Sequence, residues 1–241
     1  MQGLVKSLTE RLYYGRPNWV DGTSRFSAFI RGRLQPGFRV LDLGAGAGKA
    51  GPINLRGDVR SIIGVDSDSY IKENANIDHG VIGLAEDLPF RADSFDLIVS
   101  DWVVEHLAEV EEVASEVFRV MRSGGVFAFR TGNVRHYSYA IAAATPYWFH
   151  RLMANKVRGL SGDNGDPHAT YYRMNTRRAV RQCLTRAGFV EEELLMVEPE
   201  PSYLMFSVPS FLLGVAYERL VNRARCLSGF RACIVACFRK P

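Results

Sequence analysis

Long apolar runs are missing from this sequence of 241 residues. No stretch of about eighteen uncharged apolar residues occurs, which is the length that a membrane-spanning helix needs. Near the amino terminus, Lys6, Glu10 and Arg11 interrupt the apolar core that a secretory signal would require. We therefore expect no transmembrane helix and no signal peptide, and we expect a cytoplasmic protein.

Cysteine is also scarce, and its four occurrences follow no zinc or redox spacing, so reduced thiols are expected. No group of histidines and carboxylates shows a metal-ligand spacing, which predicts that the protein requires no metal. No recognised nucleic-acid-binding signature occurs, so nucleic acid is an unfavoured partner. Because 47% of the residues are hydrophobic and 23% are charged, the chain can build a sizeable core.

Charge is unevenly distributed along the chain, although the formal net charge is only +4. Residues 81–123 contain ten acids and three arginines, whereas residues 130–186 contain nine arginines and one lysine against two aspartates. Residues 201–241 carry six basic residues and one glutamate. One interpretation is ordinary solvated surface charge. The other is a basic face for an anionic acceptor, such as a phosphorylated lipid carrier or an anionic membrane surface.

The most informative stretch is RVLDLGAGAGKAGPI, residues 39–53. Its apolar run ends at Leu43 and predicts a buried strand. Three glycines follow at alternate positions: Gly44, Gly46 and Gly48. Glycine at this spacing lets the backbone turn tightly and lets a ligand approach it closely. A helix is expected to open near residues 49–53 with its amides toward the same crevice, which makes this a nucleotide-type cradle.

The cradle by itself leaves two ligand classes open, because residues 46–51 also match the dinucleotide pattern GxGxxG. Asp42 lies inside the predicted strand, two residues before the first glycine. A carboxylate there faces a cationic ligand well and a pyrophosphate badly. The residues therefore favour a nucleoside that carries an amino acid and a positive sulfonium, with a nicotinamide dinucleotide as the alternative.

VLDLGAGAG resembles the first motif of the class I S-adenosylmethionine-dependent methyltransferases, in particular the type-11 methyltransferase domain group. Four further segments follow in the order of that family: IIGVDSD (62–68), AEDLPF (85–90), FDLIVSDWVVEHL (95–107) and VFRVMRSGGVFAFRTGN (117–133). The resemblance covers roughly residues 38–133. It implies an α/β fold with a Rossmann-like, seven-stranded and mostly parallel sheet, helices on both faces and an antiparallel last strand.

Periodicity and turn residues predict the order of the elements. Strands are expected at 38–43, 60–65, 81–84, 95–100, 126–131, 190–197 and 231–239. Helices are expected at 3–14, 21–33, 109–122, 175–187 and 209–226, and Gly124 and Gly125 are expected to end the helix at 109–122. We expect one domain over 1–241, made of an amino-terminal helical lid (1–37), a cofactor-binding core (38–133) and helical insertions after the fifth strand (134–175) and between the sixth and seventh strands (201–230).

The resemblance also implies which residues hold S-adenosyl-L-methionine. Asp66 would accept hydrogen bonds from the ribose hydroxyls, and it lies 20 residues after Gly46, as a ribose-binding acid should. Asp87 would accept from the adenine amine while the amide of the next residue reaches the ring. The full set of expected cofactor-binding residues is Asp42, Gly44, Ala45, Gly46, Gly48, Asp66, Ser67, Asp87, Leu88 and Asp101.

The implied reaction is transfer of the sulfonium methyl by in-line displacement to a small-molecule or glycan acceptor, with a hydroxyl as the expected nucleophile. A base within reach would help its proton to leave, and the candidates are His136, His168 and His106. A lipid-linked glycan acceptor and a peripheral membrane contact through residues 204–217 are expectations from the basic, apolar later half. A small aromatic acceptor, a nicotinamide-dependent oxidoreductase and a non-catalytic scaffold remain alternatives.

Overall fold

The computed structural model describes residues 2–17, 19–48, 54–139 and 169–241. Contacts between residues divide this part of the chain into two units. The described residues of the first, which we name the helical unit, are 2–17, 19–24, 133–139 and 196–233. Those of the second, which we name the sheet unit, are 25–48, 54–132, 169–195 and 234–241.

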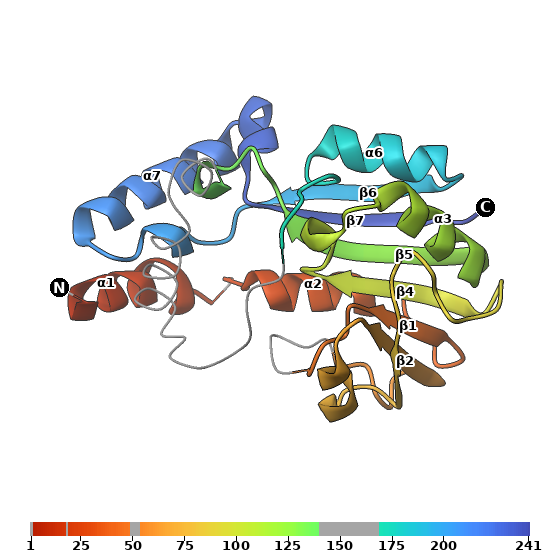
Figure 1. Cartoon of the computed structure of the whole chain (residues 1–241). Helices are drawn as coiled ribbons and strands as arrows, with labels where there is room; N and C mark the ends of the chain where they lie inside the picture. The colour runs from red at the N-terminus through yellow and green to blue at the C-terminus, as the bar shows by residue number, and fades with distance from the viewer. Residues whose placement is uncertain (1, 18, 49–53, 140–168) are drawn as a thin grey trace. The chain divides into compact units, whose positions relative to one another are not determined.

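Seven strands form one sheet with the order β3-β2-β1-β4-β5-β7-β6 (Figure 1). The strands are β1 (Arg39–Leu43), β2 (Ser61–Asp66), β3 (His79–Ile82), β4 (Phe95–Asp101), β5 (Met121–Gly132), β6 (Val190–Val197) and β7 (Cys233–Arg239). The pairs β1–β2, β1–β4, β2–β3 and β4–β5 are parallel. Strand β7 runs antiparallel to β5, because Gly124 N–H donates to the Lys240 carbonyl and Lys240 N–H donates to Gly125. The expected fold class is confirmed.

The strands and helices of the sheet unit follow from the apolar pattern. β4 is buried almost throughout, as a central parallel strand covered on both faces should be. In α3 (Val110–Val120), the valines at 110, 113, 117 and 120 are buried at helical spacing. The helix packs beside α6 (Arg177–Arg186), and the Phe118 and Phe189 rings meet edge to face nearby (Figure 1). The remaining helices of this unit are α2 (Gly22–Arg31, from residue 25 on), η2 (Ser69–Glu73) and η3 (Val104–His106).

The strand order places the candidate site. From β1 the chain builds outward through β2 to β3, and from β4 it builds in the opposite direction. The point of reversal lies between β1 and β4. In an open parallel sheet, ligands bind beyond the carboxyl ends of the strands at such a switch point. The glycine-rich loop that follows β1 begins there.

The helical unit has a small core of its own. Its elements are α1 (Gln2–Thr9), the π-helix η1 (Glu10–Tyr14), η4 (Ser202–Leu204), α7 (Val208–Arg223) and η5 (Arg225–Phe230). Val5, Tyr13, Phe211 and Val215 are buried together, and the rings of Tyr13 and Phe211 meet edge to face at 6.4 Å. This contact joins the amino-terminal helices to α7, two segments that are far apart in the sequence.

Two sequence expectations need adjustment. The expected helix 109–122 ends at Val120, because Met121 already pairs with Phe95 as part of β5. Gly124 and Gly125 therefore lie inside a strand, where their backbone groups pair with Lys240, and do not end the helix as the sequence predicted. The expected helix at 49–53 and most of the insertion 134–175 lie outside the described residues. None of the helices in the described part of the chain has the length and apolar character that crossing a bilayer requires.

Candidate cofactor site

The loop after β1 depends on glycine at three positions. Gly44, Gly46 and Gly48 have φ angles of +77°, +49° and +69°, which side-chain-bearing residues rarely adopt. A Cβ at Gly44 would lie 2.3 Å from the Val103 side chain, and one at Gly48 would lie 2.3 Å from Asn74 Oδ1. A Cβ at Gly46 would meet no atom of the described residues within 4 Å. The backbone at Gly46 therefore faces open space, where a ligand can approach it closely.

Two asparagines hold the carbonyl side of the loop. Asn74 Nδ2 donates to the carbonyls of Ala45 (2.8 Å) and Gly46 (3.2 Å), and Asn76 Nδ2 donates to Gly48 (3.0 Å). Asn74 is buried, and its Oδ1 accepts from the Asn76 amide at 2.9 Å. These two contacts were not predicted from the sequence. The one sequence signal for them is the pattern Asn-Ala-Asn after the second strand, because the contacts depend on where the chain returns to the loop.

Asp66 lies at the end of β2 and is joined to the glycine loop. Its Oδ2 accepts from the Gly46 amide at 2.8 Å, and its Oδ1 accepts from the Asp68 amide at 2.9 Å. A carboxylate oxygen has room for more than one donor. Each oxygen therefore retains capacity for a ribose hydroxyl, and the residue is only half-buried. Ser67, the next residue, is exposed beside it.

Acidic side chains gather at the carboxyl ends of β1, β2 and β4. Burial, together with the charges of Asp101 and Asp66, raises the pKa of Asp42 to about 7. Burial also raises the pKa of Asp101, although its partner Arg130 acts in the opposite direction. Like charges in a poorly solvated site make ionisation costly, and a cation bound among them would relieve that cost. The group therefore suits a positively charged ligand, as the sequence predicted.

Arg130 on β5 pairs with Asp101 through two parallel bonds. Its Nε donates to Oδ1 at 2.6 Å and a terminal nitrogen donates to Oδ2 at 2.7 Å. The guanidinium is buried and lies 5.3 Å from the ring of Phe26 and 5.1 Å from that of Trp102. Trp102 has φ = +60° and is 38% exposed, so a bulky residue occupies strained backbone at the strand end. Arg130 was not among the residues predicted from the sequence, although it lies opposite Asp101 in the parallel register of β4 and β5.

The expected adenine-side loop is described as well. Asp87 is exposed, and Leu88 is buried. The Leu88 amide donates to Glu116 Oε2 at 2.9 Å, and Glu116 is also paired with Arg119. Asp87 is thus open to a ligand, whereas the Leu88 amide would have to exchange or share its carboxylate to reach an adenine ring. Both cofactor roles stay predictions.

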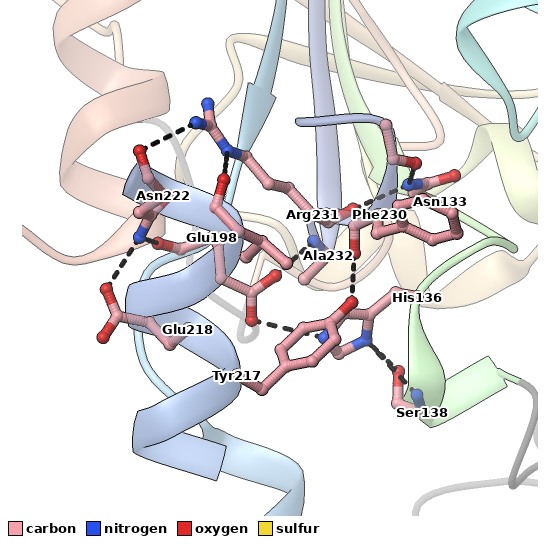
Figure 2. A network of polar contacts seen from close by, with 12 residues as sticks. Asn133, His136, Ser138, Glu198, Tyr217, Glu218, Asn222, Phe230, Arg231 and Ala232 are labelled. Atoms are coloured by element: carbon pink, nitrogen blue, oxygen red, sulfur yellow. Dashed lines mark hydrogen bonds and ion pairs between the residues drawn. The ribbon is translucent and has the colours of Figure 1, made fainter. Parts of the chain in front are cut away.

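The three histidines named as bases have different surroundings. In the sheet unit, His106 Nδ1 lies 2.9 Å from the Ala169 carbonyl. A carbonyl can only accept, so Nδ1 carries the proton and Nε2 is the basic nitrogen of the neutral ring. In the helical unit, His136 is 1% exposed and lies between Glu198 (3.2 Å) and Ser138 Oγ (2.6 Å) (Figure 2). His168 lies outside the described residues.

A buried polar network steadies the end of β4 next to His106. The Thr131 hydroxyl donates to Glu105 Oε2 at 2.7 Å, and Asn175 Nδ2 donates to Thr131 Oγ1 at 2.7 Å and to Gly132 O at 2.9 Å. Burial raises the pKa of Glu105. The network joins η3, β5 and the segment before α6. No group of three or more histidine, cysteine or acidic residues that could hold a metal ion occurs in the described ranges.

Comparisons with known proteins agree with this geometry. The family model described as "Methyltransferase domain" matches residues 41–129. An uncharacterized methyltransferase of Synechocystis sp. is 35% identical over 117 residues, 45% of this chain and 55% of that protein. A sterol 24-C-methyltransferase of Candida albicans is 29% identical over 189 residues, 73% of this chain and 47% of that protein. The chain thus spans about half the length of these curated relatives.

A solved structure gives the same fold at low identity. The geranyl diphosphate C-methyltransferase of Streptomyces coelicolor, solved with S-adenosyl-L-homocysteine, superposes with a TM-score of 0.57 at 14% identity. The match covers 90% of this chain and 79% of that one. The matched family model begins inside β1 and ends inside β5, so it includes the glycine loop, Asp66 and Asp101. Residues 41–129 of this chain thus match a methyltransferase domain, and the relatives agree with a class I S-adenosylmethionine-dependent methyltransferase.

Proposed function

We propose that this chain transfers the methyl group of S-adenosylmethionine to a small-molecule acceptor. The observation that supports this most is the glycine loop, whose backbone at Gly46 faces open space beside a half-buried Asp66 carboxylate. These residues would hold the nucleoside end of the cofactor. The carboxylates at the strand ends would favour its positive charge. When bound, the cofactor supplies a methyl group on a sulfonium. The sulfur leaves as a neutral thioether, which needs no protonation.

The work of the protein in such a reaction is mainly positioning. An in-line displacement needs the acceptor atom, the methyl group and the sulfur aligned and shielded from water. With a hydroxyl acceptor, the sulfur–carbon bond breaks, a carbon–oxygen bond forms, and the hydroxyl proton must go to a base. We place that base at His106 Nε2, because the Ala169 carbonyl fixes the proton on Nδ1. His136 is 1% exposed, so its ring offers an acceptor little access.

The acceptor atom has two candidates. The sequence favoured the hydroxyl of a sugar or lipid-linked glycan. The relatives favour a carbon atom, since the Candida albicans protein is named as a sterol C-methyltransferase. Both candidates fit a lipid-soluble or lipid-linked molecule. Isotopically labelled methyl from the cofactor distinguishes them, because product analysis shows a methoxyl group in one case and a new carbon–carbon bond in the other.

Replacing His106 tests the assigned base. With a hydroxyl acceptor, His106→Asn should lower kcat by about 100-fold or more, because proton removal no longer has a base in place. Its affinity for S-adenosylmethionine should stay within about twofold of the wild type, since His106 is not among the cofactor-holding residues. His79→Asn, at an exposed histidine on β3, is the matched control and should leave kcat unchanged. Equal kcat in His106→Asn and wild type would exclude this base.

The raised pKa of Asp42 predicts a pH-dependent affinity. Below pH 7 the carboxyl is protonated in the free protein, and a cationic cofactor must expel that proton before the carboxylate can face it. The affinity for S-adenosylmethionine should therefore rise by up to about tenfold per pH unit below pH 7 and level off above it. Calorimetric titrations between pH 5.5 and pH 7.5, about the range in which the carboxyl titrates, measure this directly.

Asp42→Asn is the control, because it keeps the shape and removes the titration. Its affinity for S-adenosylmethionine should be weaker at pH 7.5 and should change much less with pH than that of the wild type. The difference between the two pH profiles isolates the titration of Asp42 from that of the other ionisable groups. The stability of the free protein should have the opposite slope. A carboxyl whose pKa is raised on folding stabilises the fold at low pH, and that contribution is lost as the pH rises toward 7. A pH profile shared by both proteins would contradict the assignment.

A further inference from the structure

Helix α7 is apolar on the side that faces away from the core of the helical unit. Phe211 is fully buried, and its ring meets Tyr13. On the other side Leu213 is 69% exposed and Leu220 is 57% exposed. The two leucines are seven residues apart, so they lie on nearly the same line of the helix. We name the exposed residues along this line the outer stripe: Pro209, Leu212, Leu213, Ala216 and Leu220.

The orientation of α7 is fixed by polar contacts on its inner side (Figure 2). The Tyr217 hydroxyl donates to the Phe230 carbonyl at 2.6 Å. Asn222 Nδ2 donates to the Glu198 carbonyl (3.0 Å) and to Glu218 Oε1 (2.7 Å). A surface helix normally turns its polar residues outward and its leucines inward. In α7 the inner side is formed by Phe211, Val215 and Val221, whereas Leu213 and Leu220 stay on the outer side. The hydrogen bonds of Tyr217 and Asn222 hold the helix in this rotation.

Hydrogen bonds also hold the start of α7, where two aromatic residues are exposed. Ser207 and Ser210 form a capping box, and the Ser210 hydroxyl also lies 2.9 Å from the Leu204 carbonyl. These bonds hold the turn that carries Phe206, which is half exposed. Tyr203 is also exposed just before it. Aromatic side chains next to exposed leucines are typical of segments that enter the boundary between lipid headgroups and acyl chains.

The exposed charged residues at the carboxyl-terminal end of the outer stripe are arginines. Arg219, Arg223 and Arg225 are exposed at its carboxyl-terminal end. The single acid within α7 is Glu218, which bonds to Asn222 and accepts from the Tyr13 hydroxyl at 3.2 Å on the inner side. Apolar side chains followed by arginines match a membrane with anionic headgroups, since arginine can lay its stem on apolar surface and keep its charge at the headgroups.

We propose that the outer stripe, with Phe206 before it and the three arginines after it, docks this protein on an anionic lipid membrane. The helix lies along the interface, the leucines enter the acyl boundary, and the arginines contact lipid phosphates. Docking brings the enzyme to an acceptor that is held in or on the membrane. The delivery of the enzyme to its acceptor rests on the proposed methyl transfer. Membrane docking itself does not, because it is measured without cofactor or acceptor.

Vesicle flotation tests the proposal with the full chain. Wild type should float with phosphatidylcholine vesicles that contain roughly one-third phosphatidylglycerol, and should bind pure phosphatidylcholine about tenfold less. The variant Leu213→Asp/Leu220→Asp should lose about tenfold or more of its binding to the anionic vesicles. Arg219→Gln/Arg223→Gln should lose a comparable share and much of the salt sensitivity.

The matched control is Val190→Asp, because Val190 is a 56% exposed apolar residue of the sheet unit. It should float like the wild type. Unchanged circular dichroism and S-adenosylmethionine binding in every variant would show that the folds are intact. Failure of the folded wild type to float with anionic vesicles would overturn the proposal, as would equal flotation of the double leucine variant. Sedimentation of the wild type as a dimer that the leucine variant dissociates would assign the stripe to a second copy instead.

Discussion

Replacing Asp66 with alanine should weaken S-adenosylmethionine binding by about 100-fold or more. A hydrogen bond to a charged acceptor is worth about 1.5–3 kcal/mol, and the carboxylate is proposed to accept from two ribose hydroxyls. The substitution also leaves the amides of Gly46 and Asp68 without the acceptor that they have now. The loop would then lose one of the contacts that hold it in its binding conformation.

Calorimetric titration with S-adenosylmethionine and S-adenosylhomocysteine measures this loss. Both ligands should be affected alike, because the ribose is common to them. Asp58→Ala is the control, since Asp58 is an exposed acid of the same unit that pairs with Arg31 on the surface. An exposed pair contributes only about 0–1 kcal/mol to stability, so this variant should bind as the wild type does. An Asp66→Ala protein that binds within about threefold of the wild type would exclude Asp66 from the cofactor site.

Gly46→Ala should weaken cofactor binding by about 10- to 100-fold while the protein stays folded. The added methyl group would meet no atom of the described residues within 4 Å, so no steric contact among them opposes it. The positive φ angle costs about 1–2 kcal/mol for a residue with a Cβ. The larger effect falls on the ligand, because the new methyl group occupies space through which the cofactor would approach the backbone.

Gly57→Ala separates backbone strain from blocked binding. Gly57 also has a positive φ angle (+85°), and no atom of the described residues lies within 4 Å of an added Cβ. It lies in the turn before β2 and outside the glycine loop. The melting temperatures of both variants should fall below that of the wild type by similar amounts in thermal unfolding. Only Gly46→Ala should lose affinity. Normal binding by Gly46→Ala would mean that the open side of the loop does not face the cofactor.

The framework of the sheet unit was predictable because each of its signals is local. The apolar run before Gly44 predicted β1, and its burial agrees. Asp66 was identified by its distance from the glycines, and its contact with Gly46 agrees with that placement. The prediction that Gly124 and Gly125 end a helix was wrong. Their role depends on pairing with Lys240, more than one hundred residues later in the chain.

The rest of the site could not be predicted because it depends on contacts between distant segments. In the sequence, Arg130 is one charged residue within a predicted strand. Its pairing with Asp101 is visible only in the structure, where the register of β4 and β5 places the two residues opposite each other. Asn74 and Asn76 act on the loop across almost thirty residues of sequence. Similarly, the apolar character of α7 was evident from the sequence, but which leucines face outward was decided by the inner hydrogen bonds of Tyr217 and Asn222.

The central claim is that the loop after β1 binds S-adenosylmethionine. The most direct measurement is calorimetric titration of the wild-type protein at pH 7.5 with this cofactor and, separately, with reduced nicotinamide dinucleotide. We predict one site per chain with a Kd of about 1–100 μM for S-adenosylmethionine, and no heat of binding for the dinucleotide. A folded protein that binds the dinucleotide and not S-adenosylmethionine would contradict the account and make an oxidoreductase the better assignment.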